Sequence, residues 1–388
     1  MINFDNKENC CGCGICTTVC PTKSINLVTD EMGFERAKVN VDTCINCSLC
    51  NEVCPLQGET IINKPLTGYI VQCKDEMIRI DSTSGGAFTP LAKKIIDDDG
   101  VVYGVIMHDG HAQHVRSTDV KDISLMRNSK YTQSSMRRML EDQSIEQDIS
   151  SGRKVLFSGT PCQVNGIKNK YGKHDNLITV EVMCREVVSP LLLSKYIDYM
   201  EKKNHDIINK IRFRDKHYGY HYSTMNVSFS SGKQYYKPLN YDPYLKAFFS
   251  NAFARESCFS CPFRGVNRGA DITIWDAWDV SRYEHLNNDD KGSTKMLVNT
   301  EKGKVLFESC KNDFYLENCT VEELIGDVSE MEQPLAYSDN FPQMREDLVD
   351  MTSQSFFNKY WRITPSILLR NMIKTILYKN RFTRKMFF

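Results

Sequence analysis

The sequence of 388 residues has no apolar run close to the roughly 20 residues that a membrane-spanning helix needs. Neither GxGxxG nor GxxxxGKS/T occurs in it, so no recognisable dinucleotide loop or Walker loop is present. The 49 basic and 49 acidic residues balance, which gives no overall attraction to nucleic acid. No Ser–His–Asp or paired-carboxylate arrangement stands out. These absences leave the cysteines as the most informative residues.

Cysteine is abundant and unevenly distributed. Nine of the sixteen cysteines lie between Cys10 and Cys54. The N-terminal sequence MINFDNKENC lacks the apolar segment of a secretory signal peptide, so a reducing, cytoplasmic location is expected. In such a compartment, clustered cysteines bind metal more often than they form disulfides.

The spacing C-x2-C-x2-C-x3-C-P occurs twice in the first 55 residues. Three thiolates spaced in this way can surround one face of a [4Fe–4S] cluster, and in two-cluster ferredoxins the fourth cysteine binds the other cluster. The predicted ligands are Cys10, Cys13, Cys16 and Cys54 for one cluster, and Cys44, Cys47, Cys50 and Cys20 for the second.

Zinc and disulfides are the alternatives for these cysteines. A zinc site uses four ligands, often from two CxxC pairs, and it does not explain the third and fourth cysteines of a pattern that occurs twice. Cys11 lies outside the pattern and is interpreted as a bystander. Since such clusters carry single electrons, the long chain that follows is expected to use or deliver them.

The periodicity predicts an α+β protein in which a small bacterial-type ferredoxin domain precedes a mixed α/β domain without a Rossmann fingerprint. The predicted units are residues 1–60, 68–350 and a basic tail at 355–388. In the second unit we expect strands at 69–73, 101–107, 154–159 and 177–183, and helices at 86–96, 136–149, 163–171 and 189–203.

Three polar segments are candidates for binding a cofactor or an anion. Residues 84–86 separate a predicted strand from a helix, and they form either a pyrophosphate site of backbone N–H groups or a plain helix cap. The segment SKYTQSS (129–135) offers polar groups to a cofactor. The segment KIRFRDK (210–216) is interpreted either as an anion site or as a solvated strand edge. Its basic residues are Arg212, Arg214 and Lys216.

Four further cysteines also have open alternatives. One follows a strand at a helix start, one ends a strand, and two form a CxxC pair: Cys162, Cys184, Cys258 and Cys261. Zinc, a third cluster and unrelated core cysteines fit this spacing equally well. The remaining cysteines are interpreted as structural: Cys73, Cys310 and Cys319.

The segments SGGAFTPLA, SKYTQS, GTPCQ, MC-x-x-VVSP, FRDK and C-x2-C…ADITIWDAW follow one another in this order. Together they resemble the beta-subunit family of coenzyme F420 hydrogenase/dehydrogenase, here preceded by a two-cluster ferredoxin domain. The resemblance implies a flavoprotein body with FAD and a third [4Fe–4S] cluster held by Cys162, Cys184, Cys258 and Cys261. It places FAD near Ser84, Gly85, Gly86, Ser129, Lys130, Tyr131, Gln133 and Ser134.

The activity that this resemblance implies is an oxidoreductase that passes electrons between clusters, FAD and a small-molecule substrate, F420 or another. The alternative is an electron-relay subunit that serves a partner enzyme. A redox partner protein or a small-molecule donor is expected. Lys130 is the candidate for a role toward the substrate, and no residue is assigned to catalysis. One departure from the family is Glu186, in Cys-Arg-Glu, where similar proteins carry a small residue.

The C-terminal segment 355–388 contains eight Lys or Arg and no Asp or Glu. Such a segment is expected to contact either the inner surface of a membrane or a partner protein. The alternative is a helix that packs on the body with a solvated basic side. One face of the predicted helix carries Leu368, Leu369, Met372, Ile373 and Ile376.

Overall fold

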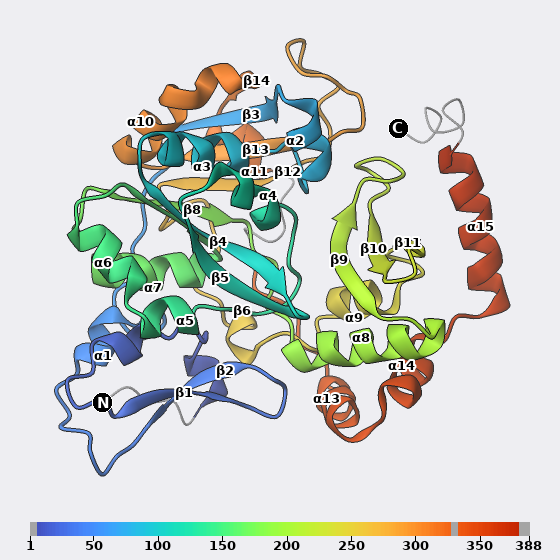
Figure 1. Cartoon of the computed structure of the whole chain (residues 1–388), viewed down its shortest axis with the longest axis horizontal. Coiled ribbons are helices and arrows are strands. Elements are labelled where there is room, and N and C mark those ends of the chain that lie inside the picture. Colours follow the sequence, from blue (N-terminus) through green and yellow to red (C-terminus); the bar gives the residue numbers. More distant parts are fainter. Residues whose placement is uncertain (1–5, 327–332, 380–388) are drawn as a thin grey trace.

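The computed structural model describes residues 6–326 and 333–379. Figure 1 shows the N-terminal unit below a large sheet, with a smaller sheet and the C-terminal helices beside it. The N-terminal unit contains a β-hairpin, and Gly33 in its turn has φ +81°. Its elements are η1 (Lys7–Asn9), η2 (Ile15–Thr18), β1 (Ile25–Thr29), β2 (Glu35–Val39) and α1 (Leu49–Val53).

In the described residues, nine strands form one mixed sheet: β3 (Thr67–Cys73), β4 (Val101–His108), β5 (His111–Ser117), β6 (Ser134–Ser135), β7 (Val155–Gly159), β8 (Leu177–Val182), β12 (Ile272–Ala277), β13 (Ser293–Val298) and β14 (Phe314–Cys319). Their order is β14-β3-β13-β12-β8-β7-β4-β5-β6. The central strands β12, β8, β7 and β4 run parallel, and antiparallel partners flank them on both sides. The mixed α/β domain that the sequence predicted is therefore confirmed.

Helices cover both faces of this sheet: α2 (Glu76–Asp81), α3 (Phe88–Asp97), η3 (Val120–Asp122), α4 (Ile123–Met126), α5 (Arg137–Glu141), α6 (Ser144–Ser150), α7 (Pro161–Tyr171), α10 (Glu301–Cys310), η5 (Lys311–Asp313) and α11 (Val321–Ile325). One face packs against α3, α4 and α10, and the other against α5, α6 and α7. The single helix predicted at 136–149 is wrong, because Gln143 adopts φ +56° and separates α5 from α6. Ile15 and Val53 of the N-terminal unit join the core on the α5–α7 side.

A further core surrounds a three-stranded antiparallel sheet, and we call it the small-sheet core. Met32 and Phe34 of the N-terminal hairpin pack into it, so the N-terminal unit contacts both halves of the molecule. The elements here are α8 (Pro190–Asn204), β9 (Ile208–Asp215), β10 (Thr224–Phe229), β11 (Gln234–Pro238), α9 (Pro243–Phe249), η4 (Glu256–Cys258), α13 (Phe341–Asp350) and α14 (Ser353–Trp361).

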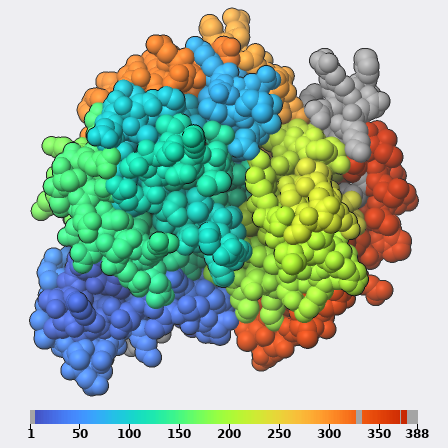
Figure 2. Space-filling model, viewed as in Figure 1, coloured from blue at the N-terminus to red at the C-terminus, as the bar shows by residue number. Residues whose placement is uncertain are grey.

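The predicted tail at 355–388 begins inside the body of the protein. Phe356 and Phe357 of α14 are fully buried in the small-sheet core. The separate helix α15 (Pro365–Lys379) then runs along the outer edge of the molecule (Figures 1 and 2). Across the described ranges, no helix combines the length and apolar character that crossing a membrane requires.

Candidate functional site

The repeated cysteines of the N-terminal unit gather in two groups, each of which combines both copies of the motif. Burial raises the pKa of Cys16 well above its usual value, and the nearby thiols of Cys10 and Cys54 add to this effect. Cys13 interacts electrostatically with Cys16 and Cys54. The second group lines one small cavity and consists of Cys20, Cys44, Cys47 and Cys50.

The two groups differ in their exposure to solvent. The four cysteines of the first group are buried, whereas Cys47 in the second group is exposed and Cys20 and Cys44 are half-buried. Among the described residues, no three His, Cys, Asp or Glu side chains are grouped as ligands of a single metal ion. The thiolates of a [4Fe–4S] cluster each bind a different iron. Both groups therefore suit such clusters in the chemistry and number of their sulfur ligands.

The four later cysteines also come together, although they lie up to 99 positions apart in the chain. Burial, followed by the thiols of Cys258, Cys162 and Cys261, raises the pKa of Cys184 well above its usual value. Cys162 lies in the first turn of α7, and a hydrogen bond with the Cys11 thiol together with burial raises the pKa of Cys162 well above its usual value. These four thiols are suitable sulfur ligands for a third [4Fe–4S] cluster.

Cys11 lies between the first N-terminal group and this later group. Its thiol interacts with those of both Cys13 and Cys162. The sequence-based interpretation of Cys11 as a bystander missed this placement, because Cys162 comes near only after the chain has folded.

Arg255 holds the N-terminal unit against the body. The side chain is fully buried, and its guanidinium lies 4.5 Å from the centre of the Phe34 ring. Its Nη2 donates hydrogen bonds to the carbonyl oxygen of Glu35 at 3.0 Å and to Oε1 of Gln133 at 2.6 Å. Sequence reasoning did not single out Arg255, because no local pattern distinguishes it from a surface arginine.

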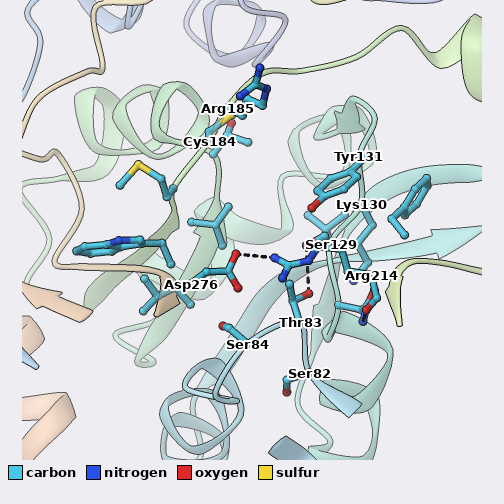
Figure 3. Close-up of a pocket in the computed structure, with 18 of the residues that line it drawn as sticks. Ser82, Thr83, Ser84, Ser129, Lys130, Tyr131, Cys184, Arg185, Arg214 and Asp276 are labelled. Atoms are coloured by element: carbon cyan, nitrogen blue, oxygen red, sulfur yellow. Dashed lines mark hydrogen bonds and ion pairs between the residues drawn. The ribbon is translucent and has the colours of Figure 1, made fainter. Parts of the chain in front are cut away.

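A cavity of about 780 Å³ opens beside these cysteines. Cys11, Cys162 and Cys184 line it, and the segment at the start of α3 lines it as well. Figure 3 shows Cys184 on the opposite side of the pocket from Ser82 and Ser84. The volume lies within the range of roughly 300–1,000 Å³ that is typical of cofactor and ligand sites.

All the residues predicted to bind FAD line this cavity except Gly85. A Cβ on Gly85 would lie 2.5 Å from the carbonyl oxygen of Val71, so this glycine is needed for packing against the sheet. Gly86 has φ +82° and turns the chain into α3. The N-terminal end of α3 therefore faces the cavity, where its partial positive charge suits a phosphate group.

Several of the predicted side chains already have protein partners. The ammonium of Lys130 donates to the carbonyl oxygens of Met126 at 2.8 Å and Arg127 at 2.7 Å, which caps α4. Burial lowers the pKa of Lys130 to about 7. Gln133 accepts a hydrogen bond from the backbone N–H of Glu35, and Ser134 accepts one from Gln163. These contacts give Lys130, Gln133 and Ser134 a structural role at the cavity wall.

Basic side chains predominate in the cavity wall. Of the three basic residues on β9 and just after it, Arg214 lines the cavity, where it forms an ion pair with Asp276 (Figure 3). Arg212 instead pairs with Asp81, and the ammonium of Lys216 is held by backbone carbonyls. The charged lining consists of Arg127, Lys130, Arg185, Arg214 and Lys374 against Glu186 and Asp276.

Glu186, the departure from the family pattern, is buried in this wall. Its carboxylate oxygens make no hydrogen bond within the described residues, and Nε of Arg185 lies 3.6 Å away. Burial raises the pKa of Glu186 to about 8.

Two family models match separate parts of this chain. Residues 2–64 match the 4Fe-4S dicluster domain. Residues 152–323 match the model for the C terminus of the coenzyme F420 hydrogenase/dehydrogenase beta subunit. The chain joins these two domains. The match confirms the two-cluster ferredoxin domain, and the beta-subunit-type domain contains all four later cysteines.

A chain of the F420-reducing [NiFe] hydrogenase complex from Methanosarcina barkeri is similar in structure. The two chains share 18% identity with a TM-score of 0.47, and the match covers 76% of this chain and 92% of the other. No curated protein matches the sequence.

Proposed function

We propose that this chain is an iron–sulfur flavoprotein oxidoreductase that passes electrons between [4Fe–4S] clusters, FAD and a small-molecule substrate. The observation that supports this most is the single cavity that joins Cys162 and Cys184 to the glycine turn at Gly86. A cofactor in this cavity would be next to the later cysteines. A substrate in the same cavity would lie beside that cofactor.

The positions of the cysteine groups suggest a path for electrons through the molecule. The group around Cys47 is the one open to solvent, and Cys50 of this group lies near Cys16 of the buried group. Cys11 then lies between Cys13 and Cys162. A donor would therefore exchange electrons at the exposed end, and the cavity would be the other terminus.

The residues that would hold FAD are the N-terminal turn of α3, the aromatic ring of Tyr131 and the guanidinium of Arg214. FAD supplies the conversion between single-electron and two-electron chemistry. Tyr131 stacks on Phe248 with ring centres 4.2 Å apart, which fixes its ring in the wall. Arg214 is held by Asp276 and by the Trp278 ring at 4.8 Å, so its charge has a defined position.

Anaerobic purification followed by iron, sulfide and flavin analysis tests this function. Three clusters and one flavin correspond to about twelve irons and one FAD per chain. Iron without flavin, together with a partner enzyme that accepts the electrons, would instead favour the relay subunit. Zinc in place of iron would contradict both. F420 is one candidate substrate because the matching family model is named for it; its reduction or oxidation by the loaded protein is measured by absorbance.

A further inference from the structure

Helix α15 exposes a continuous apolar face. The five side chains of this face are between 43% and 65% exposed: Leu368, Leu369, Met372, Ile373 and Ile376. They are the residues that the sequence placed on one side of the helix. The alternative in which this face packs on the body is therefore wrong for the described part of the helix.

The charge around this face has one sign. Arg370 and Lys374 are exposed on the same helix. The sequence from Ser355 to Phe388 contains eight basic residues and no acidic residue. The described part of α15 is 15 residues long. A helix that combines an apolar face with exposed basic residues is suited to the interface of an anionic membrane.

We infer that α15 binds the surface of an anionic lipid bilayer, with its apolar face in the acyl boundary and Arg370 beside that face at the lipid headgroups. Charge complementarity favours this occupant over a protein groove. The segment 355–388 carries only basic charges, and the surface of an anionic membrane attracts Lys and Arg. The inference goes beyond the proposed redox function and does not depend on any cofactor.

Because α15 is closely attached to the body, its contact with a membrane would position the rest of the protein. The preceding helix α14 is anchored by Phe356 and Phe357 in the small-sheet core. Only residues 362–364 separate the two helices. Lys374 also lines the large cavity. A membrane-bound α15 therefore holds the cavity close to the bilayer surface.

Flotation of the full chain with lipid vesicles tests the inference. We expect flotation with vesicles of phosphatidylcholine mixed with phosphatidylglycerol, and little with phosphatidylcholine alone. The double variant Leu369→Ser/Ile373→Ser should bind the anionic vesicles at least about tenfold more weakly. The matched control is Met77→Ser/Val305→Ser, which removes two apolar side chains that are 73% and 69% exposed on other helices. It should bind as the unaltered chain does.

A second pair of measurements tests the charge. Arg370→Gln should weaken binding about fivefold, and high salt should weaken binding of the unaltered chain. A chain ending at Ile363 keeps α14 and should fold but not float. Equal flotation of the Leu369→Ser/Ile373→Ser variant and its control would overturn the inference. So would the absence of anionic-vesicle binding by the full chain, including the case in which α15 binds a protein partner instead.

Discussion

The guanidinium of Arg255 donates a hydrogen bond to the backbone carbonyl oxygen of Cys10, with a nitrogen–oxygen distance of 3.2 Å. This contact joins the first cysteine of the N-terminal motif to a residue three positions before Cys258. One buried cation is therefore shared by two cysteine groups that are distant in the chain.

Replacing Arg255 by Met should destabilise the protein by about 2–4 kcal/mol, because several buried carbonyl and amide oxygens would lose their donor. Urea unfolding under anaerobic conditions measures the difference. The control is Arg153→Met, which alters an arginine paired with the exposed Asp99. This variant should change stability by less than about 0.5 kcal/mol. Equal midpoints for both variants would refute the structural role of Arg255.

The assignment of the first cluster predicts different outcomes for two neighbouring thiols. Cys13→Ala should lower the iron content by about four atoms per chain, because it removes a ligand. Cys11→Ala should retain the full iron content. Iron and sulfide analysis of anaerobic preparations measures the iron content of both variants. Iron loss from the Cys11 variant alone would show that Cys11, and not Cys13, is the ligand.

The assignment of a third cluster predicts different outcomes for Cys184 and Cys73. Cys184→Ala should lose about four irons while the N-terminal clusters remain. Cys73→Ala is the control, since Cys73 is a buried cysteine that lies on β3 outside the group. Electron paramagnetic resonance of the reduced proteins should show one fewer signal in the Cys184 variant. Identical spectra and iron contents would remove the third cluster.

Gly12 is required where the N-terminal loop meets the body. It has φ +73°, and a Cβ there would lie 2.5 Å from the carbonyl oxygen of Glu35 and 2.7 Å from Nη2 of Arg255. Gly152 has φ +80° with open space around it. Gly12→Ala should therefore cost more than Gly152→Ala, which has only the backbone strain of about 1 kcal/mol. Thermal unfolding compares the two variants, and equal losses would show that the loop relaxes around the methyl group.

The buried His114 is expected to make the stability of the protein depend on pH. Burial lowers the pKa of His114 to about 4. The unfolded chain takes up this proton below about pH 6.5 and the folded chain does not, so stability falls as the pH falls from about 6.5 toward 4. At about pH 5 the cost is about 2 kcal/mol. His114→Gln should reduce this acid sensitivity.

The comparison for His114 is His111→Gln, which alters an exposed histidine on the same strand. Urea unfolding at about pH 5 and about pH 7.5 gives the acid sensitivity of each protein. An unchanged pH dependence in the His114 variant would show that another group is responsible.

Much of the fold could be predicted from local patterns. The strands at 101–107 and 177–183 and the helix at 189–203 correspond to β4, β8 and α8 within a few residues. Strand β5 was missed because the alternation in His111–Ser117 is weakly apolar, and it pairs with β4 across the turn at Gly110. Strands β13 and β14 were missed as well. Their register depends on β3, more than 200 residues earlier in the chain.

The candidate site was predictable only in part. Residues 84–86 and 129–134 were recognised from their polar or glycine-rich character, but the partners of Lys130 could not be foreseen. A lysine beside a cofactor and a lysine that caps a helix have the same local sequence. The carbonyls that hold its ammonium become available only where α4 ends.

The sequence alone is enough to predict the chemistry of the N-terminal unit, because ligands two and three residues apart are held near one another by the chain whatever surrounds them. It also predicts the apolar face of α15, which follows from helical periodicity. The meeting of Cys162, Cys184 and Cys258, with Cys11 beside them, depends on how the chain folds. Parallel strand pairing brings such distant segments to the same edge of a sheet, and no local interaction encodes that meeting.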